Sequence, residues 1–322
     1  MSPERIIHWD PFSDGPLRLG SAVFSIGVFD GLHVGHRYLL DCASREAASS
    51  LSRLVVVTFD QDPDEYFVPS ERRPGKLLSN ERRLELIAEV SGATVVSVPA
   101  IRGLFAMEPA AFLDALASVA SPVAVFVGAD FRFGSHAKGT VDDVDSWCAR
   151  HGCDARPTPL LERGGSAVTA TRIRGLLSQG RVEEARELLA WRAHSVEGRV
   201  VHGRGEGAGM GFATANLELA EGASMLPAEG VYGGYALVDG VSYPAAINVG
   251  AAKSFEDATA PLEAHLLGFA GDLYGKAVEL SFIAWLREQR VFASRDELVA
   301  TVSDNIEWVR RNLGGGADVS HR

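Results

Sequence analysis

The chain has 322 residues, of which 46% are hydrophobic and 23% are charged, and its formal net charge at pH 7 is −11. The length favours about two domains, and the negative charge excludes a general electrostatic attraction to nucleic acid or to anionic membranes. The sequence contains neither a run of about 18 apolar residues nor an N-terminal signal-peptide core, so we expect a cytoplasmic, non-membrane protein.

The first informative stretch is an apolar run at residues 23–28 that leads into a turn containing glycine and then a helix. β-branched residues in the run favour a buried strand. Gly27 lies where the backbone must turn, and Gly35 allows a ligand to approach the main chain closely. Because a helix N-terminus leaves unpaired N–H groups and a partial positive charge, the turn is predicted to bind phosphate. The apolar face of the helix is predicted to comprise Leu39, Leu40, Ala43, Ala47 and Leu51.

Two histidines, His33 and His36, lie in this turn and at the first predicted helical residue. Imidazole donors there would favour the charge that grows on a phosphorus centre under attack, an effect of order 10²–10³-fold per well-placed donor. No Lys-Ser or Lys-Thr pair follows the glycines, so the turn is not a Walker A loop. A strand–helix turn with two solvated histidines is the alternative interpretation.

Further strands and helices are predicted in the rest of the first half. Their alternation favours a doubly wound parallel sheet, in which ligands bind at the carboxyl ends of the strands. Asn80 is predicted to cap the helix that follows it. The predicted strands cover residues 54–59, 94–98 and 123–128, and the predicted helices cover residues 81–90 and 109–120.

Two polar motifs follow. The run Gly-Ala-Asp-Phe-Arg-Phe-Gly comes directly after a buried strand and contains Asp130 and Phe131, although its spacing is equally typical of a core position for Phe131. Residues 168–174 precede an apolar helical face and contain Thr171 and Arg174. A capped helix N-terminus beside a guanidinium is a candidate phosphate clamp. A solvated surface charge is the alternative for Arg174.

The second half differs from the first in its glycine content and in its hydrophobic periodicity. From Val196 onward glycines are frequent and the helical period disappears, which predicts a domain boundary near residues 188–196. The Asp239-Gly240 pair indicates a hairpin, and Ser294 with Glu297 forms a capping box before a C-terminal helix. Six short strands favour a small closed barrel. They are predicted at residues 196–202, 214–219, 232–238, 241–249, 262–269 and 277–286.

Four of these motifs together resemble one family. Residues 29–36, FDGLHVGH, resemble the HxGH signature of the nucleotidyltransferase superfamily in the form found in bacterial FAD synthetases. Residues 128–134 resemble the GxDFRFG element of the same synthetases, and residues 168–174 resemble their Ser-Ser-Thr-x-Ile-Arg element. Residues 211–217, GFATANL, resemble the GFPTANL signature of riboflavin kinases.

The resemblance implies a bifunctional riboflavin kinase and FAD synthetase, with an α/β doubly wound adenylyltransferase domain at residues 1–190 and a six-stranded antiparallel β-barrel kinase domain with a C-terminal helix at residues 191–322. The kinase would use ATP to convert riboflavin to FMN, and the adenylyltransferase would convert FMN and ATP to FAD and pyrophosphate, both with Mg²⁺. The partners would be these small molecules, and the sequence leaves the oligomeric state open.

The resemblance implies roles for residues at the motif positions. It also implies a role for Glu263, which would otherwise be read as an ordinary carboxylate on a strand. The implied catalytic residues are His33, His36, Arg174 and Glu263. Nucleotide and flavin binding would fall on Gly27, Phe29, Asp30, Gly35, Asp130, Phe131, Thr171, Gly211, Thr214 and Asn216, with Thr214 and Asn216 also holding the magnesium.

Several positions of the second half depart from the family pattern. Ala213 replaces a proline, and residues 208–210 lack the arginine that usually precedes this signature. The loss of basic groups near phosphates removes charge-assisted contacts worth roughly 1.5–3 kcal/mol each. One alternative is therefore an FMN adenylyltransferase with an impaired or substrate-altered kinase domain. A cytidylyltransferase is a second alternative, since HxGH alone does not name the base, and a catalytically inactive flavin-binding regulatory protein is a third.

Overall fold

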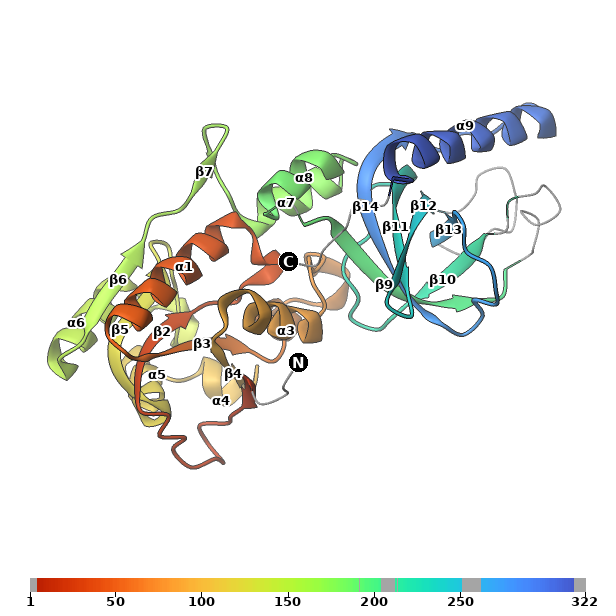
Figure 1. The fold of residues 1–322 in the computed structure, drawn as a ribbon. Coiled ribbons are helices and arrows are strands. Elements are labelled where there is room, and N and C mark those ends of the chain that lie inside the picture. The colour runs from red at the N-terminus through yellow and green to blue at the C-terminus, as the bar shows by residue number, and fades with distance from the viewer. Residues whose placement is uncertain (1–4, 191, 204–211, 213, 251–261, 316–322) are drawn as a thin grey trace. The chain divides into compact units, whose positions relative to one another are not determined.

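The computed structural model describes residues 5–190, 192–203, 212, 214–250 and 262–315 (Figure 1). The chain divides into two compact units. The first comprises Met1–Pro74 and Ser79–Ala170, and the second comprises Gly75–Leu78 and Thr171–Arg322. The short segment Gly75–Leu78 thus groups with the second unit, although the chain on both sides of it belongs to the first.

The first unit is built on a six-stranded parallel sheet, which confirms the predicted doubly wound architecture. Both edge strands were missed by the sequence reasoning. One has only three residues, and the other reads Asp-Ala-Arg-Pro-Thr, a polar run with a proline that only an edge strand tolerates. The order across the sheet is β1 (Ile6–His8), β4 (Thr94–Val98), β3 (Arg53–Phe59), β2 (Ser21–Ile26), β5 (Ser121–Gly128) and β6 (Asp154–Thr158).

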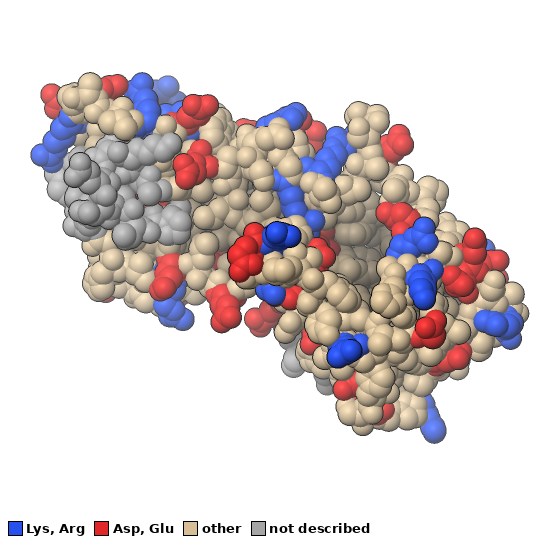
Figure 2. All heavy atoms as spheres, turned by 180° about the vertical axis from the view of Figure 1, so that it is seen from behind, with Lys and Arg blue, Asp and Glu red and all other residues tan. Residues whose placement is uncertain are grey.

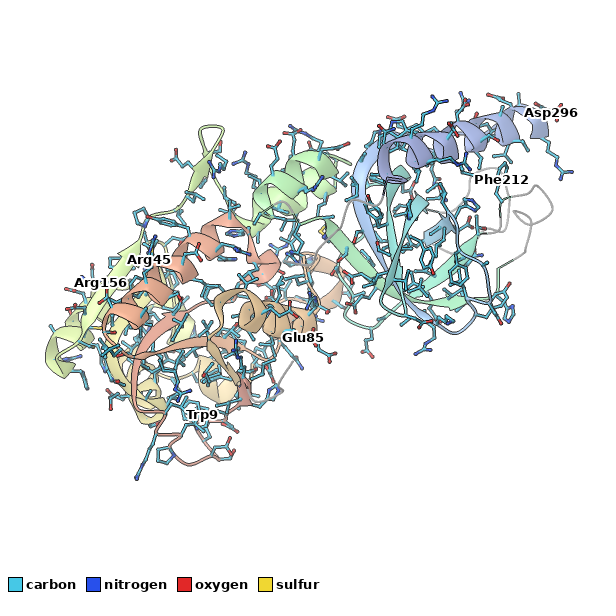
Figure 3. The ribbon with its side chains drawn as sticks, viewed as in Figure 1. Trp9, Arg45, Glu85, Arg156, Phe212 and Asp296 are labelled. Atoms are coloured by element: carbon cyan, nitrogen blue, oxygen red, sulfur yellow. The ribbon has the colours of Figure 1, made fainter. Side chains whose placement is uncertain are left out.

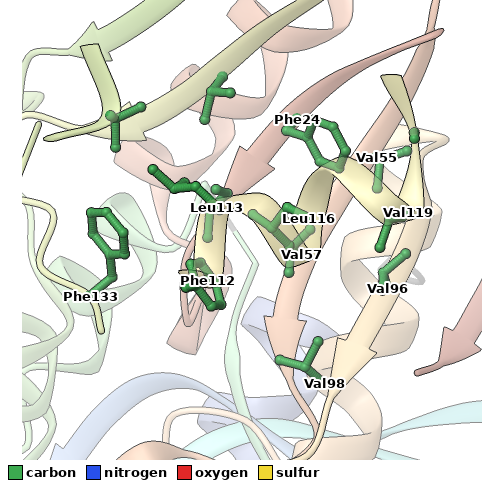
Figure 4. Close-up of a cluster of buried hydrophobic side chains, with 14 of the residues drawn as sticks. Phe24, Val55, Val57, Val96, Val98, Phe112, Leu113, Leu116, Val119 and Phe133 are labelled. Atoms are coloured by element: carbon green, nitrogen blue, oxygen red, sulfur yellow. The ribbon is translucent and has the colours of Figure 1, made fainter. Parts of the chain in front are cut away.

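Helices cover both faces of this sheet. Helices α1 (Val34–Ser49) and α3 (Asn80–Ser91) pack on one face, and α5 (Pro109–Val119) and α6 (Val141–His151) pack on the other. Figure 4 shows the apolar core beneath the second pair, where Phe24 and Val57 of the sheet meet Leu116 of α5. The shorter elements are η2 (Asp30–Leu32), α2 (Pro63–Phe67), η3 (Ser70–Arg72), α4 (Arg102–Phe105), η4 (Ser135–Ala137) and the hairpin of β7 (Glu162–Arg163) with β8 (Ser166–Ala167).

Two local predictions in this unit were wrong. Leu51 lies beyond the end of α1 with a left-handed backbone, and 93% of its surface is exposed, so it does not extend the apolar face. Ser79 rather than Asn80 caps α3, since its side chain accepts a hydrogen bond from the Arg82 backbone N–H at 3.3 Å. Both residues are favoured caps, and the backbone conformation of the preceding loop decides between them.

The second unit contains a closed antiparallel barrel, as predicted. Asp239 and Gly240 both adopt left-handed conformations and join two of its strands in the predicted hairpin. Leu217, Tyr232 and Phe282 are among the residues that fill its interior. The order around the barrel is β10 (Ala215–Leu219), β13 (Leu262–Leu266), β12 (Val241–Val249), β11 (Gly230–Val238), β14 (Ala277–Arg287) and β9 (His194–Val201).

Three helices belong to the same unit, the first of them from its second residue onward: α7 (Ala170–Leu177), α8 (Val182–Leu188) and α9 (Arg295–Leu313). Helix α8 is tied to the barrel because Glu183 accepts a hydrogen bond from the Trp285 backbone N–H at 2.9 Å. Helix α9 is capped by Ser294, as predicted, and packs Val309 against Tyr235 of the barrel. Among the described residues, no helix is long and apolar enough to cross a membrane.

Candidate active sites

The turn after β2 has an unusual backbone. Phe29, Gly31 and Leu32 have φ values of 60°, 72° and 39°, so three of four consecutive residues are left-handed. For non-glycine residues this conformation costs roughly 1–2 kcal/mol each and persists only where the surroundings impose it. Gly27 leaves room for the Phe29 ring at the start of the turn, since a Cβ there would lie 3.2 Å from it. Strain of this kind concentrates at functional sites.

His33 is the N-cap of α1, a role that the sequence reasoning missed. Its Nδ1 accepts a hydrogen bond from the His36 backbone N–H at 3.3 Å. The proton of the neutral ring is therefore assigned to Nε2, which leaves an Nε2–H donor. The two imidazole rings stack with centroids 3.7 Å apart. Gly35 makes room for this arrangement, because a Cβ at that position would lie 3.2 Å from the His33 ring.

Both histidines are electrically neutral near pH 7. Burial lowers the pKa of His33 to about 4, and burial together with the neighbouring His33 lowers the pKa of His36 well below its ordinary value. His33 is only 6% exposed, which excludes the alternative of two solvated histidines. The pair can therefore supply neutral N–H donors, which need no proton exchange with solvent before they act.

Two other residues of the turn, Phe29 and Asp30, are buried, and Phe29 packs against His36. Phe29 is buried and its ring meets the His36 ring edge-on, with centroids 5.3 Å apart. Asp30 is also buried, at the start of η2. The structure thus places Phe29 in the core, with its ring against His36 and beside Gly27, and buries Asp30 in the same turn.

The second motif follows the neighbouring strand. Strand β5 pairs with β2, and the strand order reverses between them, which is where open α/β sheets bind ligands. Gly128 ends β5, and Asp130 is exposed directly after it. Phe131 is partly buried and stacks on Phe133 with centroids 5.2 Å apart. The two motifs that are far apart in the sequence therefore lie at adjacent strand ends.

A cluster of aromatic side chains stands beside these strand ends and was not predicted. Tyr66 and Phe67 of α2 are 45% and 60% exposed, and both pack against Phe105 of α4, with centroids 5.2 and 4.6 Å apart. Phe105 in turn contacts Phe59, the last residue of β3. The sequence pattern that indicates helix α2 is Asp-Pro-Asp-Glu at residues 62–65, and the sequence reasoning overlooked it. These residues form a capping box with proline in the first helical turn.

The third motif divides between the units. The Val168 carbonyl lies 3.7 Å from the position of a Cβ on Gly35, so the motif begins beside the N-terminus of α1. Thr171 is exposed in the first turn of α7, and Arg174 Nε donates to the Gly75 carbonyl at 2.7 Å. Thr171 and Arg174 belong to the second compact unit.

In the barrel, three polar residues form a row across neighbouring strands. Asn216 of β10 is paired with Glu263 of β13, which is paired with Asn248 of β12. Residues paired directly across antiparallel strands point to the same face. Their sequence neighbours are buried, so the row lies on the outer face of the barrel; these neighbours are Ala215, Leu217, Leu262, Ala264, Ile247 and Val249.

The surroundings of this row constrain its side chains. A Cβ on Gly203 would lie 1.9 Å from Asn216 Nδ2, so the amide of Asn216 occupies the space beside that glycine. The Oδ1 of Asn248 accepts a hydrogen bond from Gln289 Nε2 at 3.0 Å. Thr214 is exposed just before β10, and Gly211 lies outside the described residues.

Phe212, like Thr214, lies just before the start of β10. Its ring is edge-on to that of His265 of β13, with 6.3 Å between the ring centroids (Figure 3). The sequence reasoning did not predict Asn248 or Gln289 as site residues, because strand pairing places Asn248 beside Glu263 and a tertiary hydrogen bond places Gln289 beside Asn248.

Charge on the surface is mixed. On the face shown in Figure 2, basic and acidic side chains are interspersed and no large field of one sign is formed. On that face, any attraction for phosphate groups therefore arises locally, from N–H donors and individual cations.

Comparisons with known proteins find relatives of both halves of the chain. The family described as FAD synthetase matches residues 17–172, and the family described as riboflavin kinase matches residues 190–313. The chain is 32% identical to the bifunctional riboflavin kinase/FMN adenylyltransferase of Escherichia coli strain K12, over 91% of this chain and 93% of that protein. It is 28% identical to the Bacillus subtilis protein of the same name, over 90% and 92%.

Among solved structures, a crystal structure described as a macrolide-efflux protein from Streptococcus pneumoniae has a TM-score of 0.83 and 26% identity, covering 95% of this chain and 99% of that one. Both halves of the chain thus match known domains in the predicted order. The chain belongs to the bifunctional riboflavin kinase/FMN adenylyltransferase family.

Proposed function

We propose that this enzyme makes FAD from riboflavin in two steps carried by separate groups of residues. The riboflavin kinase region phosphorylates riboflavin with ATP, and the FAD synthetase region transfers AMP from a second ATP to the FMN produced. Membership of the bifunctional family supports both activities. The observation that carries the residue assignment is the stacked, neutral His33–His36 pair at the point where the strand order reverses.

In adenylyl transfer, a phosphate oxygen of FMN attacks the α-phosphorus of ATP, and the bond to the leaving pyrophosphate breaks. The Nε2–H of His33 and a ring N–H of His36 donate to the phosphate oxygens that gain charge, and N–H groups in the first turn of α1 add to this field. Gly27, Asp30, Gly35 and Asp130 shape the nucleotide side of this site.

The exposed faces of Tyr66 and Phe67 are suited to the flat isoalloxazine ring of FMN. Aromatic rings stack favourably by about 0.5–1.5 kcal/mol beyond the area that they bury. Phe105 holds both rings in place. The cluster follows β3 and β4, so it lies at the carboxyl edge of the sheet, as the histidine turn does. Phe131 provides a second aromatic surface at that edge.

In the kinase step, the terminal ribityl hydroxyl of riboflavin attacks the γ-phosphorus of ATP, and ADP leaves. Glu263 accepts the hydroxyl proton as the new oxygen–phosphorus bond forms. Asn216 is held opposite this carboxylate by the β10–β13 pairing. Thr214 and Asn216 provide oxygen atoms beside it, and Gly211 precedes them in the same motif.

The residues present fit a magnesium ion held jointly with nucleotide phosphates. Thr214 and Asn216 offer neutral hard oxygens, and Asn216 is confined beside Gly203. Among the described residues no group of three His, Cys, Asp or Glu could hold a metal by itself. Mg²⁺ typically binds through few protein ligands, waters and substrate phosphates. When bound, the ion would neutralise phosphate charge.

One assay tests both halves. The purified chain is incubated with Mg²⁺, ATP and either riboflavin or FMN, and the flavins are resolved chromatographically. We expect FMN and FAD from riboflavin, and FAD from FMN. FMN without FAD would overturn the adenylyltransferase, and FAD only from supplied FMN would leave an impaired kinase domain. A repeat with CTP distinguishes a cytidylyltransferase, and no conversion at all would indicate a flavin-binding regulatory protein.

A further inference from the structure

Helix α3 carries a buried arginine on its apolar side. Arg83 is 1% exposed and lies beside Leu84, Leu86 and Ile87, which are also buried. A charge in such a position costs several kcal/mol unless hydrogen bonds satisfy it. Burial lowers the pKa of Arg83, while the carboxylates of Asp62, Asp30, Glu65 and Asp60 act in the opposite direction. A guanidinium remains charged under these conditions because its ordinary pKa is far above neutrality.

The hydrogen bonds of Arg83 join two strand ends. Nη1 donates to the Val28 carbonyl at 2.9 Å and to Thr58 Oγ1 at 2.7 Å, and Nη2 donates to the Phe59 carbonyl at 3.0 Å. Thr58 Oγ1 also donates to the Val28 carbonyl, at 3.2 Å. The planar fork of a guanidinium suits several acceptors at fixed angles, which a lysine ammonium cannot match.

The hydrogen bonds of Arg83 lie just beyond the last backbone pairing between β2 and β3. The last paired residues of β2 and β3 are Ile26 and Val57, and the Gly27 backbone N–H still donates to the Val57 carbonyl at 3.2 Å. Beyond that point Arg83 links Val28 to the end of β3. Val28 directly precedes the left-handed Phe29, whose ring supports His36. The position of the Val28 carbonyl therefore sets the direction of the strained turn.

We propose that Arg83 is a positioning residue for adenylyl transfer, which fixes the ends of β2 and β3 and thereby holds the Phe29–His36 turn in its reactive geometry. The proposal rests on the proposed adenylyltransferase function. A displacement of about 1 Å at reacting groups lowers a rate by about 100-fold. Loss of the Arg83 fork is thus expected to act on the rate of FAD formation more than on substrate binding.

The test uses the full chain, because its riboflavin kinase activity reports separately on the other half. The variant Arg83→Lys keeps the charge and removes the fork. We expect kcat for FAD formation, per folded chain, to fall by about 100-fold with KM for ATP within about threefold. Riboflavin phosphorylation should stay within about twofold of wild type. Arg82→Lys is the matched control, since Arg82 pairs with Glu85 and Glu89 on the same helix, where Figure 3 labels Glu85.

A second variant covers the case in which Arg83→Lys folds poorly. Thr58→Val keeps the shape of the side chain and removes the hydroxyl that accepts from Arg83 and donates to the Val28 carbonyl, while the direct bond from Arg83 to that carbonyl remains. It should lower kcat for FAD formation about tenfold, and the double variant should lose no more than Arg83→Lys alone, because both act through one carbonyl.

Three results would overturn the proposal: full kcat per folded chain in both single variants, additive losses in the double variant, or a change confined to KM. A purely structural role would lower the folded fraction and leave kcat per folded chain unchanged. If the wild-type chain itself makes no FAD, the proposed function fails instead, so the two failures are distinguishable.

Discussion

Asn216 and Glu263 face the same side of the barrel because they are directly paired between β10 and β13. Their sequence neighbours alternate into the core, which leaves both polar side chains on the outer face. Two groups proposed for one phosphoryl transfer are thus held together by backbone pairing rather than by proximity in the sequence.

Glu263→Gln tests the proposed base. The amide keeps the size of the side chain and cannot accept the proton, so riboflavin phosphorylation should fall by about 10²–10⁴-fold. FAD formation from supplied FMN should stay at the wild-type rate. Glu218→Gln, at an exposed position of β10, is the control and should change neither activity. A Glu263→Gln enzyme that phosphorylates riboflavin normally would exclude Glu263 as the base.

Gly203→Ala tests the confinement of Asn216. The new Cβ would lie 1.9 Å from Asn216 Nδ2, so the amide must move. We expect riboflavin phosphorylation to fall by about 10–100-fold, consistent with misplacement of a substrate-positioning group. Gly315→Ala meets no atom within 4 Å and serves as the control. Unchanged kinase activity in Gly203→Ala would show that the position of Asn216 is not needed for the reaction.

His33→Asn separates the two roles of His33. Asparagine is a favoured N-cap and can still accept the His36 backbone N–H, but it removes the imidazole Nε2–H. FAD formation should fall by about 10²–10³-fold, while the free energy of unfolding should change by less than about 1 kcal/mol. His33→Ala should lower both FAD formation and the free energy of unfolding, because alanine provides neither the donor nor the cap. Equal activity in His33→Asn and wild type would leave His33 with capping alone.

The pH dependence of FAD formation tests whether the histidines act as neutral donors. The pKa of His33 is lowered to about 4, so the ring is neutral throughout the range above about pH 5. The rate should therefore be level between about pH 6 and pH 8 and should fall only as the pH approaches 4. A catalytic imidazolium would give the opposite sign, a rate that falls as the pH rises through 6.5. Steady-state kcat measured in one mixed buffer decides between them.

Phe67→Ala tests the aromatic cluster as the flavin platform. The side chain is 60% exposed, so its removal should change stability little. Loss of one stacking face should raise KM for FMN by about 3–10-fold, which corresponds to the usual strength of an aromatic pair. KM for ATP and riboflavin phosphorylation should be unaffected. An unchanged KM for FMN would place the isoalloxazine ring elsewhere.

Much of the fold could be predicted because it follows from local patterns. Apolar β-branched runs gave the central strands, and the Asp239-Gly240 pair gave its hairpin. The edge strands β1 and β6 lacked that pattern, since an edge strand needs few apolar residues and can contain proline. The cap of α3 and the exposure of Leu51 depended on where the backbone leaves the helix, and residue type alone does not determine this.

The histidine turn was predicted as a phosphate-binding site from its residues alone, and the family resemblance of their short patterns predicted the loop after β5 and the GFATANL stretch as further sites. Only the tertiary structure decided the surroundings of these residues. Strand pairing joined Asn216 to Glu263, burial made His33 and His36 neutral, and the packing of α3 carried Arg83 to the Val28 carbonyl. Sequence patterns report local conformation, whereas charge state, tautomer and hydrogen-bond partners depend on neighbours brought in from distant parts of the chain.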